Sequence, residues 1–280
     1  MITCNIATIG KKDLPQAWNE LNAEQYTAVF KVLAQQHETD QAYLLHILLL
    51  WWRTSAAKLA GINWFKALRS KGDITIPSLL ITELQEEIFP EMQFVFDKEK
   101  KCTTNHLAQL RHQNILYAGP ADMLLDVTGA EMEVVEYCYA SHIALKRSRK
   151  YEVLLCAALW REMENGCKRP FDKDEVHDRA TQLASLPDEV ITAMRFFYES
   201  CMYTYHQRYK KIFKKSEEGD RPDPQAWRKL NRALAGEKRG TVEEVRAMKL
   251  DDIFLELNEL ERDRQAMKDF YEKLKQRHHD

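Results

Sequence analysis

The chain has 280 residues, of which 45% are hydrophobic and 30% charged, and its formal net charge is −2. A chain of this length can bury a large core, either as one extended helical body or as two modest domains. The balanced charge gives no global reason to expect nucleic acid, so such a partner would need a local basic patch. Glycine and proline are scarce, at 9 and 8 residues, which argues against long loops and β-rich turn networks.

The six cysteines are scattered, without a C-x-x-C pair or a histidine at zinc-finger spacing, so free thiols in a reducing cytoplasm are expected. The first residues lack the charged-then-apolar order of a signal peptide. The longest apolar run, residues 43–52, is too short for the roughly 20 residues of a membrane helix. These features predict a cytoplasmic protein with no membrane span.

The N-terminal segment is predicted to hold one or two short strands, followed by helices. Alternation of apolar and polar residues over 2–6 indicates a strand. The segment PQAW follows, in which Trp18 and Leu21 lie three apart and are expected to be buried anchors. Asn22 with Gln25 resembles a capping box and predicts the start of the first helix.

Helices in the next part of the chain are predicted where apolar residues recur three and four positions apart. The polar stretch 97–105 is expected to be an exposed loop, and a sub-boundary is placed near residues 97–120. Before that loop, helices are predicted over residues 23–37, 40–59, 62–70 and 78–89, with a second strand over 92–96.

A strong helix signal begins at Thr128, which forms an S/T-x-x-E capping box with Glu131. The basic cluster at residues 146–150 is expected to close this helix, because cations suit the negative end of a helix dipole. Further helices are predicted over 151–164, 172–186 and 187–215. The apolar face of the helix that begins at Thr128 is predicted from Val134, Val135, Cys138, Ile143 and Leu145.

Turn-forming and charged residues predict a linker over residues 216–224. The domain prediction is therefore a helical core over residues 1–215 and a linker plus C-terminal helical region over 216–280. A second PQAW opens a helix that ends at Gly236, with Trp227 and Leu230 as its expected anchors. The likeness to the first PQAW ends after that motif, so a duplicated domain is not indicated.

The last helix is predicted to begin near Leu250 after a short capped helix at 241–244, and it carries a heptad seam with a polar interruption at Arg264. This helix either lies back on its own body or protrudes and pairs with a partner or a second copy. The fold class is thus mainly α, a multi-helical body with one or two short N-terminal strands and a C-terminal amphipathic helical arm. The expected partner-binding residues are Ile253, Leu257, Leu260 and Met267.

Side chains for chemistry do not converge in the sequence. The pair His106 and His112 is six apart and would point to different helix faces, so no metal site is expected. Among nearby carboxylates, Glu131 is interpreted as the cap, and Glu133 and Glu136 as one solvated helix face. With no nucleophile elbow, zinc-protease motif or P-loop, the prediction is a non-enzymatic protein without cofactors.

Nucleic-acid binding is the alternative from a different class. Basic residues outnumber acidic ones over residues 207–240, with aromatic residues interleaved, as a stacking surface requires. However, Tyr205, Tyr209 and Phe213 lie four apart, which is also the pattern of a buried helical stripe. A protein partner is therefore preferred over nucleic acid.

The turn of Gly119, Pro120 and Asp122, the helix start at Thr128 and Glu131, and the patterns of the two helices around residues 155–161 and 186–198 share one set of spacings. In these features the middle of the chain resembles an uncharacterised group of helical proteins from phages and prophages of Bacteroidetes-type bacteria. The likeness covers roughly residues 12–260 and consists of a G-P-x-D turn, an L-T-x-x-E helix start and two helix patterns. Val127 departs from it, because the group usually has leucine there. The matching residues are Gly119, Pro120 and Asp122; Thr128 and Glu131; Leu155, Ala157, Leu159, Trp160 and Arg161; and Leu186, Pro187, Ala193, Phe197 and Tyr198.

This resemblance implies a place among tail-morphogenesis proteins near the tape-measure protein. The chain would then be a tail-assembly chaperone that binds a helical tape-measure-type protein, or alternatively a minor structural tail component. The turn at Gly119 and Pro120 would be a structural anchor. No active-site residue is carried over by the resemblance.

Overall fold

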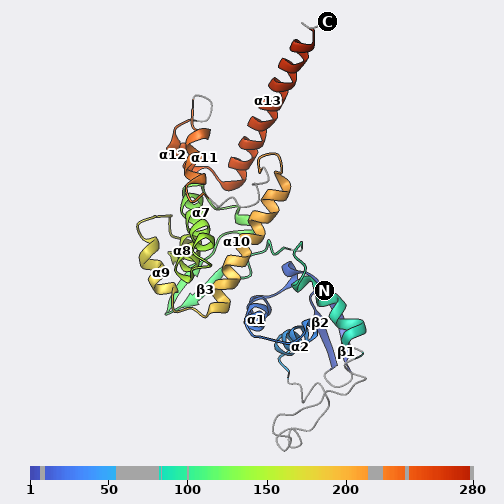
Figure 1. Ribbon diagram of the computed structural model, residues 1–280. Helices are drawn as coiled ribbons and strands as arrows, with labels where there is room; N and C mark the ends of the chain where they lie inside the picture. The colour runs from blue at the N-terminus through green and yellow to red at the C-terminus, as the bar shows by residue number, and fades with distance from the viewer. Residues whose placement is uncertain are drawn as a thin grey trace, which may run out of the picture. The chain divides into compact units, whose positions relative to one another are not determined.

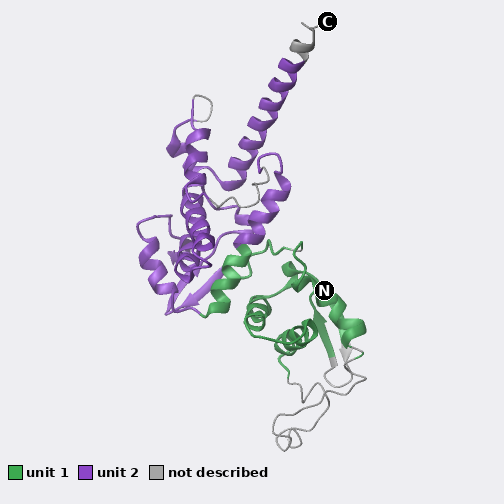
Figure 2. Ribbon diagram, in the orientation of Figure 1, with its two compact units in different colours: residues 1–106, 187–197 green, residues 107–186, 198–280 purple. Residues whose placement is uncertain are grey.

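The computed structural model describes residues 1–6, 10–54, 82, 84–99, 101–213, 223–236 and 240–277 (Figure 1). The chain divides into two compact units (Figure 2). Unit 1 comprises residues 1–106 and 187–197, and unit 2 comprises residues 107–186 and 198–280. Helices predominate in the described chain, so the mainly α prediction is confirmed at this coarse level.

Unit 1 begins with an antiparallel pair of short strands, in which Ile2 lies opposite Leu14. The helix after them starts at Asn22, whose side chain accepts from the Gln25 backbone, so the predicted capping box is confirmed. Both N-terminal strands fit the predicted fold class. The elements are β1 (Ile2–Ile6), β2 (Gly10–Leu14), η1 (Trp18–Glu20), α1 (Ala23–Leu33) and α2 (Asp40–Trp51).

The strand predicted over residues 92–96 is wrong, because this segment is helical. Pro90 lies in the first turn of its helix, where a missing backbone N–H costs nothing. Buried Ile88, Met92 and Val95 continue a spacing of three and four, which suits a helix rather than a strand. The elements are the π-helix η2 (Leu84–Ile88), α6 (Phe89–Met92) and η3 (Gln93–Val95).

Several other predicted boundaries in unit 1 differ or lie outside the described residues. The helix predicted to reach residue 37 ends at Leu33. The helix predicted over 62–70 lies outside the described residues, as does the predicted end of the helix over 40–59. In the loop predicted to be exposed over 97–105, Cys102 is buried, and the Thr103 backbone donates a 2.9 Å hydrogen bond to Asn19 Oδ1.

An aromatic cluster around Trp18 forms the core of unit 1. Trp18 is 2% exposed, and its ring lies with a centroid distance of 4.7 Å from Phe196 and 5.7 Å from Phe94. Tyr26 packs edge-on against Trp18 and donates a 2.8 Å hydrogen bond from its hydroxyl to the Ala193 carbonyl. Because Phe196 and Ala193 lie on α10 (Asp188–Arg208), the cluster joins η1 and α1 to a distant part of the chain.

Unit 2 contains a four-stranded antiparallel sheet in the order β3-β4-β5-β6, which the sequence analysis did not predict. Its β5–β6 hairpin turns at Asn165 and Gly166, which have φ values of 50° and 78°, the left-handed conformation that this pair favours. The predicted end of the helix over 151–164 is therefore wrong, because its last residues form a strand. The strands are β3 (Gln109–His112), β4 (Ile115–Ala118), β5 (Arg161–Glu164) and β6 (Cys167–Lys168).

In unit 2, helices α8, α11, α12 and α13 contact α7, whose N-terminus is capped by Thr128 with Glu131 (Figure 1). A second capping box, Thr241 with Glu244, begins α12. The elements are η4 (Asp122–Leu124), α7 (Gly129–Ala144), α8 (Arg149–Leu159), α9 (Val176–Leu183), α11 (Ala226–Leu234), α12 (Val242–Ala247), α13 (Leu250–Arg277) and the second half of α10.

The end of α7 differs from its prediction. Ile143 and Leu145, expected on the apolar face, are 39% and 56% exposed. Lys146 and Arg147 adopt positive φ values in the connection that follows, while Arg149 already belongs to α8. The basic cluster is therefore divided between a turn and the start of the next helix.

A second aromatic cluster forms around Phe254 of α13. Trp227 is 7% exposed and lies with a ring centroid 5.7 Å from that of Phe254, while Tyr205 and Tyr209 of the α10 region lie at 4.7 and 5.5 Å. Close by, a Cβ added at Gly129 would approach Ile253 Cδ1 to 2.9 Å. The start of α13 is thus a core element of unit 2. The predicted linker at 216–224 lies mostly outside the described residues.

We predict that Trp18→Ala lowers the free energy of unfolding by about 3–5 kcal/mol, because it removes the ring on which the aromatic cluster of unit 1 packs. Urea denaturation followed by circular dichroism would measure the change. Phe270→Ala is the matched control: Phe270 is 58% exposed, so its loss should change stability by no more than about 0.5 kcal/mol. Equal effects of the two variants would contradict this account of the core.

Candidate protein-binding surfaces

A buried ion pair positions the first turn of α7. Arg161 Nη2 lies 2.9 Å from Glu131 Oε1, and the two side chains are 7% and 2% exposed. The other oxygen of Glu131 accepts hydrogen bonds of 2.8 Å from the Thr128 backbone N–H and from its hydroxyl. Desolvation lowers the pKa of Arg161, while the Glu131 charge opposes this shift. Glu131 therefore serves both as cap of α7 and as counter-ion of Arg161.

The other two carboxylates of α7 are also engaged, which corrects their interpretation as one solvated face. Glu133 accepts hydrogen bonds of 2.8 Å from Arg246 and 2.9 Å from the Asn231 side chain. Glu136 accepts from the Tyr198 hydroxyl and from the Trp227 indole. Desolvation raises the pKa of Glu136, and the two hydrogen bonds oppose that rise.

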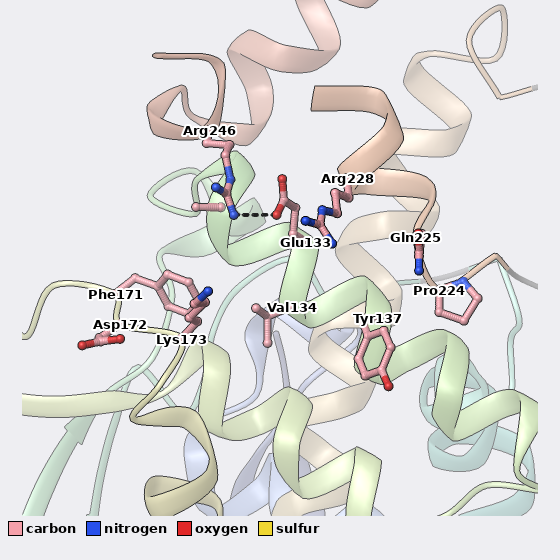
Figure 3. A pocket seen from close by; sticks show the side chains of 11 residues that line it. Glu133, Val134, Tyr137, Phe171, Asp172, Lys173, Pro224, Gln225, Arg228 and Arg246 are labelled. Carbon is pink, nitrogen blue, oxygen red and sulfur yellow. Dashed lines mark hydrogen bonds and ion pairs between the residues drawn. The ribbon is translucent and has the colours of Figure 1, made fainter. Parts of the chain in front are cut away.

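One face of α7 borders a groove made of two adjoining cavities of about 570 and 540 Å³. Both cavities are lined by Val134, Tyr137 and Lys173, so they form one surface, here called the α7 groove (Figure 3). The first cavity continues toward α11 and α12. The second continues toward α8 and α9, where Tyr151 and Leu154 line it.

The α7 groove has an aromatic lining and a charged rim. Tyr137 is 46% exposed and its ring meets Tyr151 edge-on, while Phe171 lines the opposite side of the first cavity. Figure 3 shows Arg228 and Arg246 on either side of Glu133, with a hydrogen bond drawn between Arg246 and Glu133. An apolar centre with a charged rim is the composition found at protein-binding surfaces.

The predicted partner-binding residues of α13 do not share one environment. Ile253 is 0% exposed and packs at Gly129, so it belongs to the core and is withdrawn from the surface. Leu257 is half-buried, whereas Leu260 and Met267 are 37% and 57% exposed. Phe270, which lies outside the predicted partner-binding residues, is as exposed as Met267.

The part of α13 beyond Glu261 has a continuous exposed surface. Every side chain over residues 262–272, here called the arm, is exposed. Figure 1 shows this part of α13 running away from α7, α11 and α12 of the same unit. Met267, Phe270 and Tyr271 are 57%, 58% and 57% exposed. An apolar stripe of this kind on an uncovered helix is a typical docking surface for another helix.

The remaining predicted anchors have structural contacts. Leu21 is 4% exposed, and Leu230 is only half-buried. The Gly119 backbone N–H donates a 2.9 Å hydrogen bond to the Ala108 carbonyl beside the β3–β4 hairpin, and Pro120 is buried. Gly119 and Pro120 therefore shape the entry of the chain into α7.

The aromatic residues weighed for nucleic-acid binding are buried, and the histidines weighed for a metal site have contacts within the protein. Tyr205 and Tyr209 are 0% and 6% exposed, so neither ring is available to stack on a base. His106 donates to the Trp18 carbonyl at 2.8 Å, and His112 contacts the Ser185 hydroxyl. Among the described residues, no three His, Cys, Asp or Glu side chains are grouped to hold a metal ion.

Comparison with known proteins adds no family to this description: no family model, curated protein or solved structure matches the chain. In the described part of the chain, no helix has the length and apolar character needed to cross a membrane.

We predict that Arg161→Met destabilises the protein by about 3–5 kcal/mol, because it leaves the Glu131 charge buried without its partner. The double variant with Glu131→Gln should recover part of this loss, since glutamine can still fill the capping position. Urea unfolding of both variants would measure the difference. A double variant as unstable as the single one would contradict the uncompensated-charge explanation.

We also predict a pH-dependent effect of Glu136→Gln. The pKa of the Glu136 carboxyl is higher in the folded chain than in the unfolded chain. Below the unfolded pKa this carboxyl therefore makes its full contribution to stability, and that contribution is lost as the pH rises through the folded pKa. The stability of the natural chain relative to this variant should therefore decrease as the pH rises above about 4, near the ordinary pKa of a glutamate.

Urea unfolding at a series of pH values measures this difference. Glu259→Gln, at an exposed position of α13, controls for the loss of one carboxylate. A difference that does not vary with pH would contradict the prediction.

Proposed function

We propose that this chain is a non-enzymatic phage-tail morphogenesis protein, a tail-assembly chaperone that binds a helical tape-measure-type protein through α13. The observation that supports this proposal most is the uncovered apolar stripe of the arm. Met267 and Tyr271 lie four residues apart on one helix side, and both are more than half exposed. The class of partner comes from the resemblance to a group of phage and prophage proteins, which implies a place in tail morphogenesis.

The chemistry of such a partner fits the arm. A tape-measure protein is long, helical and apolar-faced until the tail tube surrounds it, so its seam needs a temporary cover. Pairing of one heptad seam with another buries both apolar faces and leaves charged residues outside. Because Ile253 belongs to the core, the proposed surface consists of Leu257, Leu260, Met267 and Tyr271. This binding would take place in the host cytoplasm.

The prediction is that Leu260→Asp with Met267→Asp abolishes capture of a co-expressed tape-measure fragment in a pull-down assay. Each substitution places a charge in the seam, where pairing would bury it without a partner. The matched control is Gln265→Asp with Ala266→Asp, which adds the same charge at exposed positions on the other side of the helix. Circular dichroism would show whether both variants keep their helix content.

Unchanged capture by the seam variant would overturn the proposed surface. Equal loss in both variants would assign the effect to charge rather than to seam contacts. Assembled tail particles provide a further test of class, because a chaperone is absent from them, whereas a minor structural tail component copurifies with them. Recovery of the chain in purified tails would replace the chaperone proposal by the structural one.

A further inference from the structure

We infer that two copies of this chain pair through antiparallel α13 helices when no partner helix is bound. The pairing places Arg264 beside Met267 of the second copy, and Leu260 beside Tyr271 of the second copy. Arg264, Met267 and Tyr271 all lie in the arm, where every side chain is open to solvent. The occupant is identified by the charges that flank the seam.

The seam positions of α13 fix the register. Leu257, Arg264 and Tyr271 are seven residues apart, and Leu260 and Met267 form the second row of the same seam. In an antiparallel pair, each residue of one row packs against a residue of the other row. Centring the pair between residues 264 and 267 aligns the two rows and covers the stripe over residues 260–271.

The charges beside the seam complement each other in this register. Glu261 and Lys268 occupy equivalent flanking positions, one residue after Leu260 and Met267. The antiparallel arrangement brings Glu261 of each copy next to Lys268 of the other, so the contact occurs twice. The aliphatic part of Arg264 can cover Met267 of the second copy while its guanidinium stays in water.

The parallel arrangement is disfavoured by the same residues. It would place Arg264 against Arg264 of the second copy in the middle of the seam. It would also bring Glu256 next to Glu261 of the second copy, which is repulsive, although Asp263 would meet Lys268 favourably. By symmetry each flanking contact occurs twice, so the two acidic contacts offset the two favourable ones. The central cation pair remains uncompensated, so the antiparallel arrangement is selected.

The pair is expected to be weak and concentration-dependent. Residues 260–271 span about 18 Å at the rise of an α-helix, which is short for a coiled coil. A weak pair suits an arm that must exchange its cover, because a partner helix would use the same seam as the second copy. The inference concerns the chain alone and does not depend on the identity of the partner helix.

The test is sedimentation velocity of the full chain and its charge variants over a range of concentrations. The natural chain should show reversible dimer formation. Glu261→Lys and Lys268→Glu, each alone, replace two attractive contacts by two repulsive ones and should raise the dissociation constant about tenfold. An equimolar mixture of these two variants should dimerise again, because the lysines of one variant then face the glutamates of the other at both flanking contacts.

The charge variants also distinguish the two helix directions. In a parallel pair, Glu261→Lys would meet Glu256 of the second copy and strengthen association, so stronger dimerisation of that variant would overturn the antiparallel register. A chain that stays monomeric up to its solubility limit would overturn self-pairing itself. Neither result would affect the proposed capture of a tape-measure fragment, which is measured with that fragment present.

Discussion

The buried ion pair between Glu131 and Arg161 is the constraint on which unit 2 depends. Both charges are removed from water, so each needs the other, and Glu131 must also satisfy the backbone N–H of Thr128. The pair therefore ties the first turn of α7 to the start of β5, and with it the sheet. Once the first turn of α7 is set, the rest of the helix has a defined orientation toward α11 and α12.

This orientation explains why three carboxylates of one helix meet three different environments. Glu131 faces Arg161, Glu133 faces Arg246 and Asn231, and Glu136 accepts from Tyr198. The partners come from segments far away in the sequence, and helical spacing alone cannot identify them. Local spacing therefore correctly predicted the cap at Glu131, while its assignment of Glu133 and Glu136 to a solvated face was wrong.

Features held by local hydrogen bonds could be predicted from the sequence, and features held by distant contacts could not. The helix starts at Asn22 and Thr241 depend on residues three positions away, which the sequence displays directly. The strand β5 depends instead on pairing with β4, whose residues lie about forty positions earlier. The Asn165–Gly166 turn is the local signal that could have indicated the β5–β6 hairpin.

The helix α13 shows the same limit within a single pattern. Ile253 and Met267 belong to one heptad seam, yet the first is buried at Gly129 and the second is more than half exposed. The chemistry of the seam is alike in both places, so the difference arises only from where the body of unit 2 ends along the helix. One stripe thus performs two tasks: its beginning fastens α13 to unit 2, and its continuation leaves an apolar surface that another helix can cover. A substitution at Ile253 would therefore act through folding, whereas under the proposed function one at Met267 would act through association.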